Sequence, residues 1–248
     1  MRVYLSVVFI FLLTMENAVS QETLESLEQH LGEQWEKISA FTAQVKMTAD
    51  ITAKGIRMNT AMEGPMVLER LPDGSSRYRT EMDGNIKIGP FGLINFDTKS
   101  LMVSDGDVLY SETRSMNKIT VTKSRADAKP EDAPGGGSSK LAAARKKFDL
   151  KVLPEETLRG RPVYVLQGKP KEAQQPDSPV QIDRALFYFD KATGIQLRIS
   201  VFDTADNVIT QLDFNNIRLN PRVDPKQFDY TPPTGAEIID NTVQPAVE

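Results

Sequence analysis

Cysteine is absent from the 248 residues of this sequence, and histidine and tryptophan occur once each, as His30 and Trp35. Without cysteine the chain has no disulfides, iron–sulfur clusters, thiolate zinc sites or cysteine nucleophiles. A single histidine excludes a multi-histidine metal site, and a Ser-His-Asp triad would have to use His30. We therefore expect neither an enzyme nor a protein that carries a metal or another cofactor.

An excess of positive charge is missing too, because 30 Lys and Arg residues oppose 34 Asp and Glu, for a net charge of −4. Proteins that bind nucleic acid need a basic face that displaces counterions from phosphates, so we expect no nucleic-acid partner. With 40% hydrophobic and 26% charged residues, the composition is typical of a folded chain. Nothing in it requires an oligomer, and we expect a monomer.

The N-terminus has the features of a secretory signal peptide. Arg2 precedes an apolar run over residues 3–13, and Ala18-Val19-Ser20 offers small side chains for cleavage before Gln21. The run is about half the length that spans a bilayer. We expect residues 1–20 to be removed and residues 21–248 to form a single domain in the periplasm. Because Gln21 is not a cysteine, no lipid anchor is expected.

Residues 22–40 predict an amphipathic helix. Apolar side chains recur there in steps of three and four and so share one face, namely Leu24, Leu27, Leu31, Trp35 and Ile38. This stripe must pack against another element. His30 lies beside it, and we interpret it as a half-buried helix residue because no nucleophile motif accompanies it.

From Phe41 onward the period of the pattern changes to two, which predicts strands. Met47 alternates with polar neighbours in the first strand, and Met58, Met62 and Met66 fall on one face of the second. Further strands are expected at residues 75–82, 108–113, 119–123, 150–153, 163–167, 185–189, 196–202 and 208–219. Hairpin turns are predicted at 83–84 and 105–106, a loop at 90–92 and one helical turn at 224–228.

Proline and glycine interrupt the strands over residues 126–139, where we expect a flexible loop. The alanine- and lysine-rich residues 140–148 then predict a short inserted helix. The total is about nine to twelve strands, which short turns make antiparallel. A single sheet of that size must curl or close, so the expected fold is mainly β (α+β).

Seven methionines lie in the first half of the mature chain, at positions 47, 58, 62, 66, 82, 102 and 116. Methionine is flexible and polarizable, so a wall of methionines can repack around ligands of different shape. Two interpretations stay open, a filled core in one half of the sheet and an adaptable apolar cavity. On a curved sheet they overlap, because a concave face is both core and pocket.

Three motifs resemble those of the bacterial outer-membrane lipoprotein carrier family and its LolA-like relatives. Residues 187–198 (FYFDKATGIQLR) resemble its strand, D-x-x-T-G, strand hairpin, and residues 228–240 resemble its closing F-x-F-x-P-x-G-x-x-(I/V)-(I/V)-D signature. Residues 104–110 resemble its D-G-x-x-(L/W)-Y hairpin, and the similarity extends over most of residues 22–240.

The resemblance implies a half-open antiparallel β-barrel whose concave face is capped by the two helices and holds acyl chains of lipids or lipoproteins. Membrane-bound donor or acceptor proteins are implied as partners, and catalytic residues are not. We assign the lining of this cavity by face to Leu31, Trp35, Met47, Met58, Met62, Met66, Phe187 and Phe189. The alternative is an envelope-sensing or protein-interaction module on the same fold, without transport. A hydrolase has only isolated carboxylates and serines to support it.

Overall fold

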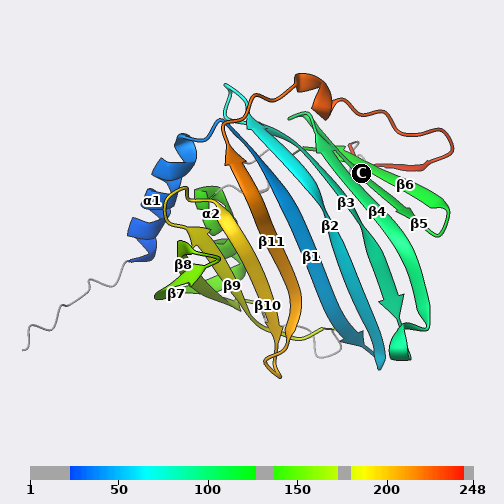
Figure 1. Cartoon of the computed structure of the whole chain (residues 1–248), viewed down its shortest axis with the longest axis horizontal. Helices are drawn as coiled ribbons and strands as arrows, with labels where there is room; N and C mark the ends of the chain where they lie inside the picture. The colour runs from blue at the N-terminus through cyan, green and yellow to red at the C-terminus, as the bar shows by residue number, and fades with distance from the viewer. Residues whose placement is uncertain (1–22, 127–136, 173–179, 243–248) are drawn as a thin grey trace, which may run out of the picture.

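The computed structural model describes residues 23–126, 137–172 and 180–242 (Figure 1). The predicted signal peptide lies outside these ranges, and so do residues 127–136 of the predicted flexible loop. Within them the chain forms two α-helices, twelve strands and two short 3₁₀ helices. Their bounds are α1 (Leu24–Glu36), β1 (Ala40–Ala53), β2 (Ile56–Arg70), β3 (Ser76–Ile88), η1 (Pro90–Gly92), β4 (Ile94–Ser104), β5 (Val108–Ser115), β6 (Lys118–Arg125), α2 (Gly137–Lys147), β7 (Phe148–Leu158), β8 (Arg161–Pro170), β9 (Ile182–Asp190), β10 (Gln196–Asp203), β11 (Val208–Leu219), η2 (Pro225–Phe228) and β12 (Glu237–Asp240).

All twelve strands belong to one sheet, in the order β12-β6-β5-β4-β3-β2-β1-β11-β10-β9-β8-β7. Strands β1 to β6 form one antiparallel meander and β7 to β11 another, and pairing of β1 with β11 joins the two. The predicted mainly antiparallel fold, with one helix before the sheet and one inserted midway, is confirmed. The sheet is open rather than closed into a barrel, with β12 at one edge and β7 at the other.

The C-terminal segment after β11 crosses the sheet to reach its far edge (Figure 1). On the way η2 packs against β3, where the guanidinium of Arg77 lies 4.7 Å from the ring centroid of the buried Phe228. The segment ends in β12, which pairs in parallel with β6. The helical turn at residues 224–228 is confirmed as η2, whereas strands β4 and β12 were not predicted.

The hairpin turn predicted at Asp83-Gly84 is wrong, because both residues lie inside β3. Gly84 is needed for close approach rather than for a turn. A Cβ added to it would lie 2.0 Å from the carbonyl oxygen of Ala61, and a Cβ on Gly64 would lie 1.8 Å from that of Glu81. The two glycines therefore let the backbones of β2 and β3 approach each other more closely than any side chain would allow, as happens in curved sheets.

The C-terminal boundary of the predicted flexible loop, residue 139, also differs from the structure. Helix α2 begins at Gly137, three residues before the predicted start, so residues 137–139 are helical rather than loop. Glycine and serine are both well tolerated at the N-terminus of a helix, which explains why a stretch that looks like a linker starts one here.

Candidate functional site

Helices α1 and α2 pack together against the same part of the sheet. The side chain of Thr23 caps the start of α1 by accepting a hydrogen bond from the backbone N–H of Ser26. One turn on, Leu27 and Leu31 are fully buried. They share a cluster with buried residues of α2, β8 and β9, namely Leu141, Ala144, Tyr164, Leu166, Ala185, Phe187 and Phe189.

An ion pair also joins the two helices, because the guanidinium of Arg145 of α2 lies 2.5 Å from the carboxylate of Glu28 of α1. Further along α1, Trp35 lies outside the first cluster and packs edge-on against Phe41 of β1, with ring centroids 6.0 Å apart. A second cluster surrounds this pair and includes Met66 and Leu68 of β2. Helix α1 therefore bridges the two meanders on one side of the sheet.

The strand register shows that this side is one continuous face. Phe187 lies opposite Ile199, Ile199 opposite Leu212, and Leu212 opposite Met47, which in turn lies opposite Met62. Side chains directly opposite each other in an antiparallel pair point to the same face. We call this side of the sheet the helix-bearing face.

All eight predicted cavity residues lie on the helix-bearing face or pack onto it from α1. Six of them are buried by other side chains of the protein, which are Leu31, Trp35, Met62, Met66, Phe187 and Phe189. Met47 and Met58 are half-buried. The six buried residues form core in this structure, whereas the two half-buried methionines keep surface that a ligand can reach.

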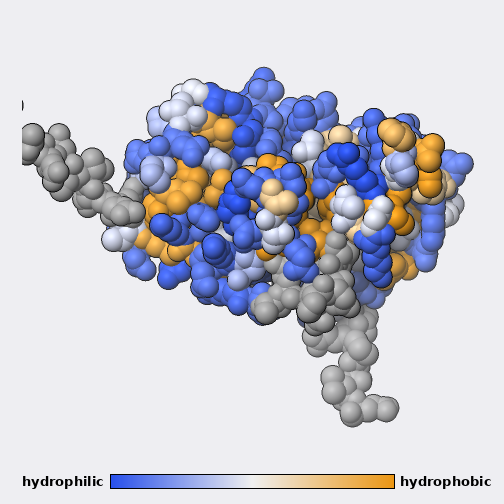
Figure 2. Space-filling model, turned by 90° about the horizontal axis from the view of Figure 1, so that it is seen from below, coloured by the Kyte–Doolittle hydropathy of each residue, from blue (hydrophilic) through white to orange (hydrophobic). Residues whose placement is uncertain are grey.

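Burial on the helix-bearing face falls toward the end of the sheet that carries the β1–β2 and β3–β4 turns. Ile51, Met58, Ile88 and Ile94 form the last row of opposed residues across β1 to β4. The first three are half-buried, and Ile94 is exposed. Figure 2 looks toward this end and shows apolar side chains at the surface. The helix-bearing face is thus closed beneath the helices and open at this end.

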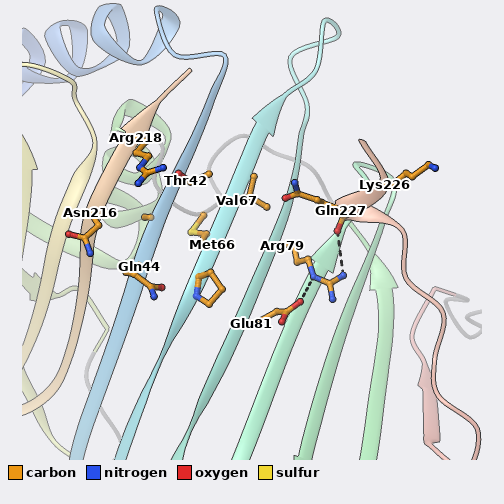
Figure 3. Close-up of a pocket in the computed structure, with 12 residues that line it drawn as sticks. Thr42, Gln44, Met66, Val67, Arg79, Glu81, Asn216, Arg218, Lys226 and Gln227 are labelled. Carbon is orange, nitrogen blue, oxygen red and sulfur yellow. Dashed lines mark hydrogen bonds and ion pairs between the residues drawn. The ribbon is translucent and has the colours of Figure 1, made fainter. Parts of the chain in front are cut away.

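A groove of about 740 Å³ opens on the opposite face (Figure 3). It lies where β11, β1, β2 and β3 meet η2, and its lining includes Val67, Pro65, Gln44, Thr42 and Asn216. Arg79 of β3 pairs with Glu81 at 2.5 Å and donates to the backbone carbonyl of Gln227. Arg218 and Lys226 also line it, and neither makes an ion pair within the described part of the chain. The groove can accept an anionic or peptide-like ligand.

Sequence reasoning missed this groove. Its walls come from the first three strands, the last strand of the second meander and the C-terminal segment. No local motif marks such a site, because only the crossing of the C-terminal segment brings these residues together.

The single histidine, His30, makes contacts that hold α1 to the sheet. His30 Nε2 lies 3.0 Å from the backbone carbonyl oxygen of Lys191, and its ring packs edge-on against Tyr164 at 5.7 Å. It therefore ties α1 to the β9–β10 turn.

Within the described ranges, no three His, Asp or Glu side chains gather as they would around a metal ion. Neither of the two described helices is long and apolar enough to cross a bilayer.

The most deeply buried glutamate is also part of a structural contact. Glu112 of β5 is 3% exposed, pairs with Arg114, and accepts a hydrogen bond from the hydroxyl of Tyr230 at 2.5 Å. Burial raises the pKa of Glu112, but hydrogen bonds from Arg114 and Tyr230 outweigh it and hold the pKa below the usual value. This carboxylate fastens the C-terminal segment to the sheet.

No protein-family model matches this chain, and no curated protein matches its sequence. Solved structures do resemble it. The Pseudomonas aeruginosa MucA/MucB complex shares 14% identity at a TM-score of 0.43, over 84% of this chain and 61% of that one. An uncharacterized conserved protein from Thermus thermophilus shares 13% identity at a TM-score of 0.45, over 86% and 98%. A putative outer membrane lipoprotein-sorting protein domain from Vibrio parahaemolyticus shares 11% at 0.35, over 84% and 97%. The chain spans about three fifths of the length of the MucB chains, and identities this low describe a similarity of fold only.

Proposed function

We propose that this protein is a periplasmic carrier, without enzymatic activity, that holds acyl chains of lipids or lipoproteins on the helix-bearing face. The observation that supports this is the continuity of that face. It runs from the clusters beneath α1 and α2 to a half-buried row at the open end of the sheet. The predicted export signal supports the periplasmic location, and membrane-bound donor or acceptor proteins complete the proposal.

Burial of hydrocarbon supplies the driving force for such a ligand. Each CH₂ group that leaves water contributes about 0.8 kcal/mol, so a chain of about 14 carbons contributes roughly 11 kcal/mol at most. Met47 and Met58 already keep exposed surface, and Met62 lies opposite Met47. Because methionine side chains change rotamer easily, this part of the face can repack around an acyl chain.

The test is binding of a fluorescent fatty acid to delipidated protein, with native mass spectrometry to count bound lipids. Met58→Glu places a charge on the helix-bearing face and is expected to weaken binding about tenfold or more. Ala61→Glu, at an exposed position on the opposite side of the same strand, is the matched control and should bind as the unaltered protein does. Absence of binding, or equal loss in both variants, would contradict the proposal.

A second candidate function uses the groove on the opposite face. Arg218 and Lys226 favour an acidic peptide there, as expected of an envelope-sensing or protein-interaction module. Capture of a membrane protein by the unaltered chain and its loss in Arg218→Glu/Lys226→Glu, together with no fatty-acid binding, would favour this alternative.

A further inference from the structure

Four apolar side chains stand exposed at the open end of the sheet. Phe91 lies in η1, and Leu93 and Ile94 directly follow it; they are 106%, 79% and 55% exposed. Ile56, the first residue of β2 after the neighbouring β1–β2 turn, is 57% exposed. We call these four residues the apolar tip. A soluble protein rarely leaves several large apolar side chains together in water, and such a group marks a contact surface.

The apolar tip is held in shape by its own backbone. The N–H of Gly89 donates to the carbonyl of Arg57 at 2.8 Å, which ties the β3–β4 connection to the start of β2. Pairing of β3 with β4 continues up to Ile88 and Ile94, so the turn projects from paired strands. Phe91 itself has a φ of 56°, a left-handed conformation that is unfavourable for phenylalanine. The fold therefore presents this ring outward at a conformational cost.

Basic side chains accompany the apolar tip. Lys54 lies in the β1–β2 turn, and the side chain of Lys87 passes beside Gly92 of η1. Neither lysine makes an ion pair in the part of the chain that the structure describes. Arg57 also lies here but is paired with Asp50. Exposed apolar side chains with neighbouring lysines that make no ion pair are typical of segments that enter the interface of an anionic bilayer.

The apolar tip is continuous with the open end of the helix-bearing face. Ile94 belongs both to the apolar tip and to the last row of that face, opposite Ile88 and next in line to Met58. We propose that the apolar tip inserts into the surface of a bilayer that contains anionic lipids. Resting on the proposed function, this contact would place the open end of the acyl-binding face at the membrane, so that an acyl chain passes between them without crossing water.

The test is flotation of the exported, processed protein with lipid vesicles. Phosphatidylethanolamine vesicles that contain phosphatidylglycerol should bind it, and phosphatidylcholine vesicles should bind it less. Phe91→Ser/Leu93→Ser is expected to weaken binding about tenfold or more, because both side chains lose apolar area that the bilayer would bury. Ile238→Ser/Ile239→Ser is the control, since these residues are 56% and 43% exposed on β12, away from the apolar tip.

Equal vesicle binding by the two double variants, or no binding by the unaltered protein, would overturn the proposal. Binding only to vesicles that carry a membrane protein would overturn it in favour of a protein receptor. Equal binding to both lipid mixtures would overturn the role given to Lys54 and Lys87. Fatty-acid binding in solution is a separate measurement, which the Phe91→Ser/Leu93→Ser variant should retain. A protein that floats through its tip but binds no fatty acid would refute the proposed function and leave this inference standing.

Discussion

Substitution of Leu31 by alanine tests whether α1 is packed as core. Leu31 is fully buried between the helices and β8 and β9. Leu→Ala at such a site removes apolar burial and leaves a cavity, which together cost about 3 kcal/mol or more. For a chain of this length, each kcal/mol lowers the melting temperature by roughly 2–4 °C, so we expect a decrease of about 6–12 °C.

Fluorescence of the single tryptophan allows this loss of stability to be measured. Trp35 lies on α1 and is 7% exposed against Phe41, so its fluorescence reports whether α1 is docked. Urea unfolding should show a lower midpoint for Leu31→Ala, and Gln29→Ala on the exposed side of the same helix should change stability by less than about 0.5 kcal/mol. A cost below about 1 kcal/mol for Leu31→Ala would refute the reasoning, because α1 would then be only loosely placed on the sheet.

Two further substitutions test the bend in the sheet and the C-terminal segment. Gly84→Ala should lower stability by about 2 kcal/mol or more in urea unfolding, since its Cβ meets the backbone of β2, whereas Asn85→Ala should be nearly neutral. Tyr230→Phe removes the hydrogen bond to Glu112 and should cost about 1.5 kcal/mol at neutral pH. Because the folded-state pKa of Glu112 is lowered, its contribution is present above the unfolded pKa and is lost as pH falls through the folded value. The penalty of Tyr230→Phe should therefore shrink in acid, and a penalty that does not depend on pH below neutrality would contradict this role.

Most of the fold follows from the period of the apolar residues. Residues 208–219 were predicted as a strand and form β11 with the same bounds, because β-favouring residues between two turn signals identify a strand without tertiary information. The error at Asp83-Gly84 arose because glycine marks a turn and is equally required where two strands approach closely, as Gly84 does with β2. Strand β12 was not predicted because it forms only by pairing with β6, more than 100 residues earlier in the chain.

The candidate site was less predictable than the fold. Alternation places Met58, Met62 and Met66 on one face of the second strand, and the strand register adds Met47, which lies opposite Met62, to the same face. Which of these methionines are buried depends on how α1 and α2 pack on the sheet, and the spacing of apolar residues along the chain does not contain that information. The apolar tip was missed for a related reason. Pro90-Phe91-Gly92 predicts a loop, but a loop sequence does not say whether its phenylalanine folds inward or points to solvent.

If the protein carries acyl chains as proposed, the docking of α1 limits the affinity that it can reach. If an acyl chain takes the place of Leu27, Leu31 and Trp35, the protein loses their burial, at about 2 kcal/mol each or roughly 6 kcal/mol in all. A chain of about 14 carbons offers roughly 11 kcal/mol at most, so about 5 kcal/mol at most remains, which corresponds to a dissociation constant no tighter than the high micromolar range. A ligand that lies only along Met47 and Met58 avoids that cost but buries less of its length. Under the proposed function, the cost of displacing α1 would keep binding reversible, and release into a bilayer, which buries the whole chain again, would be favourable. The contact between α1 and the sheet therefore stabilises the protein without ligand and, under the proposed function, would limit how tightly it retains a lipid.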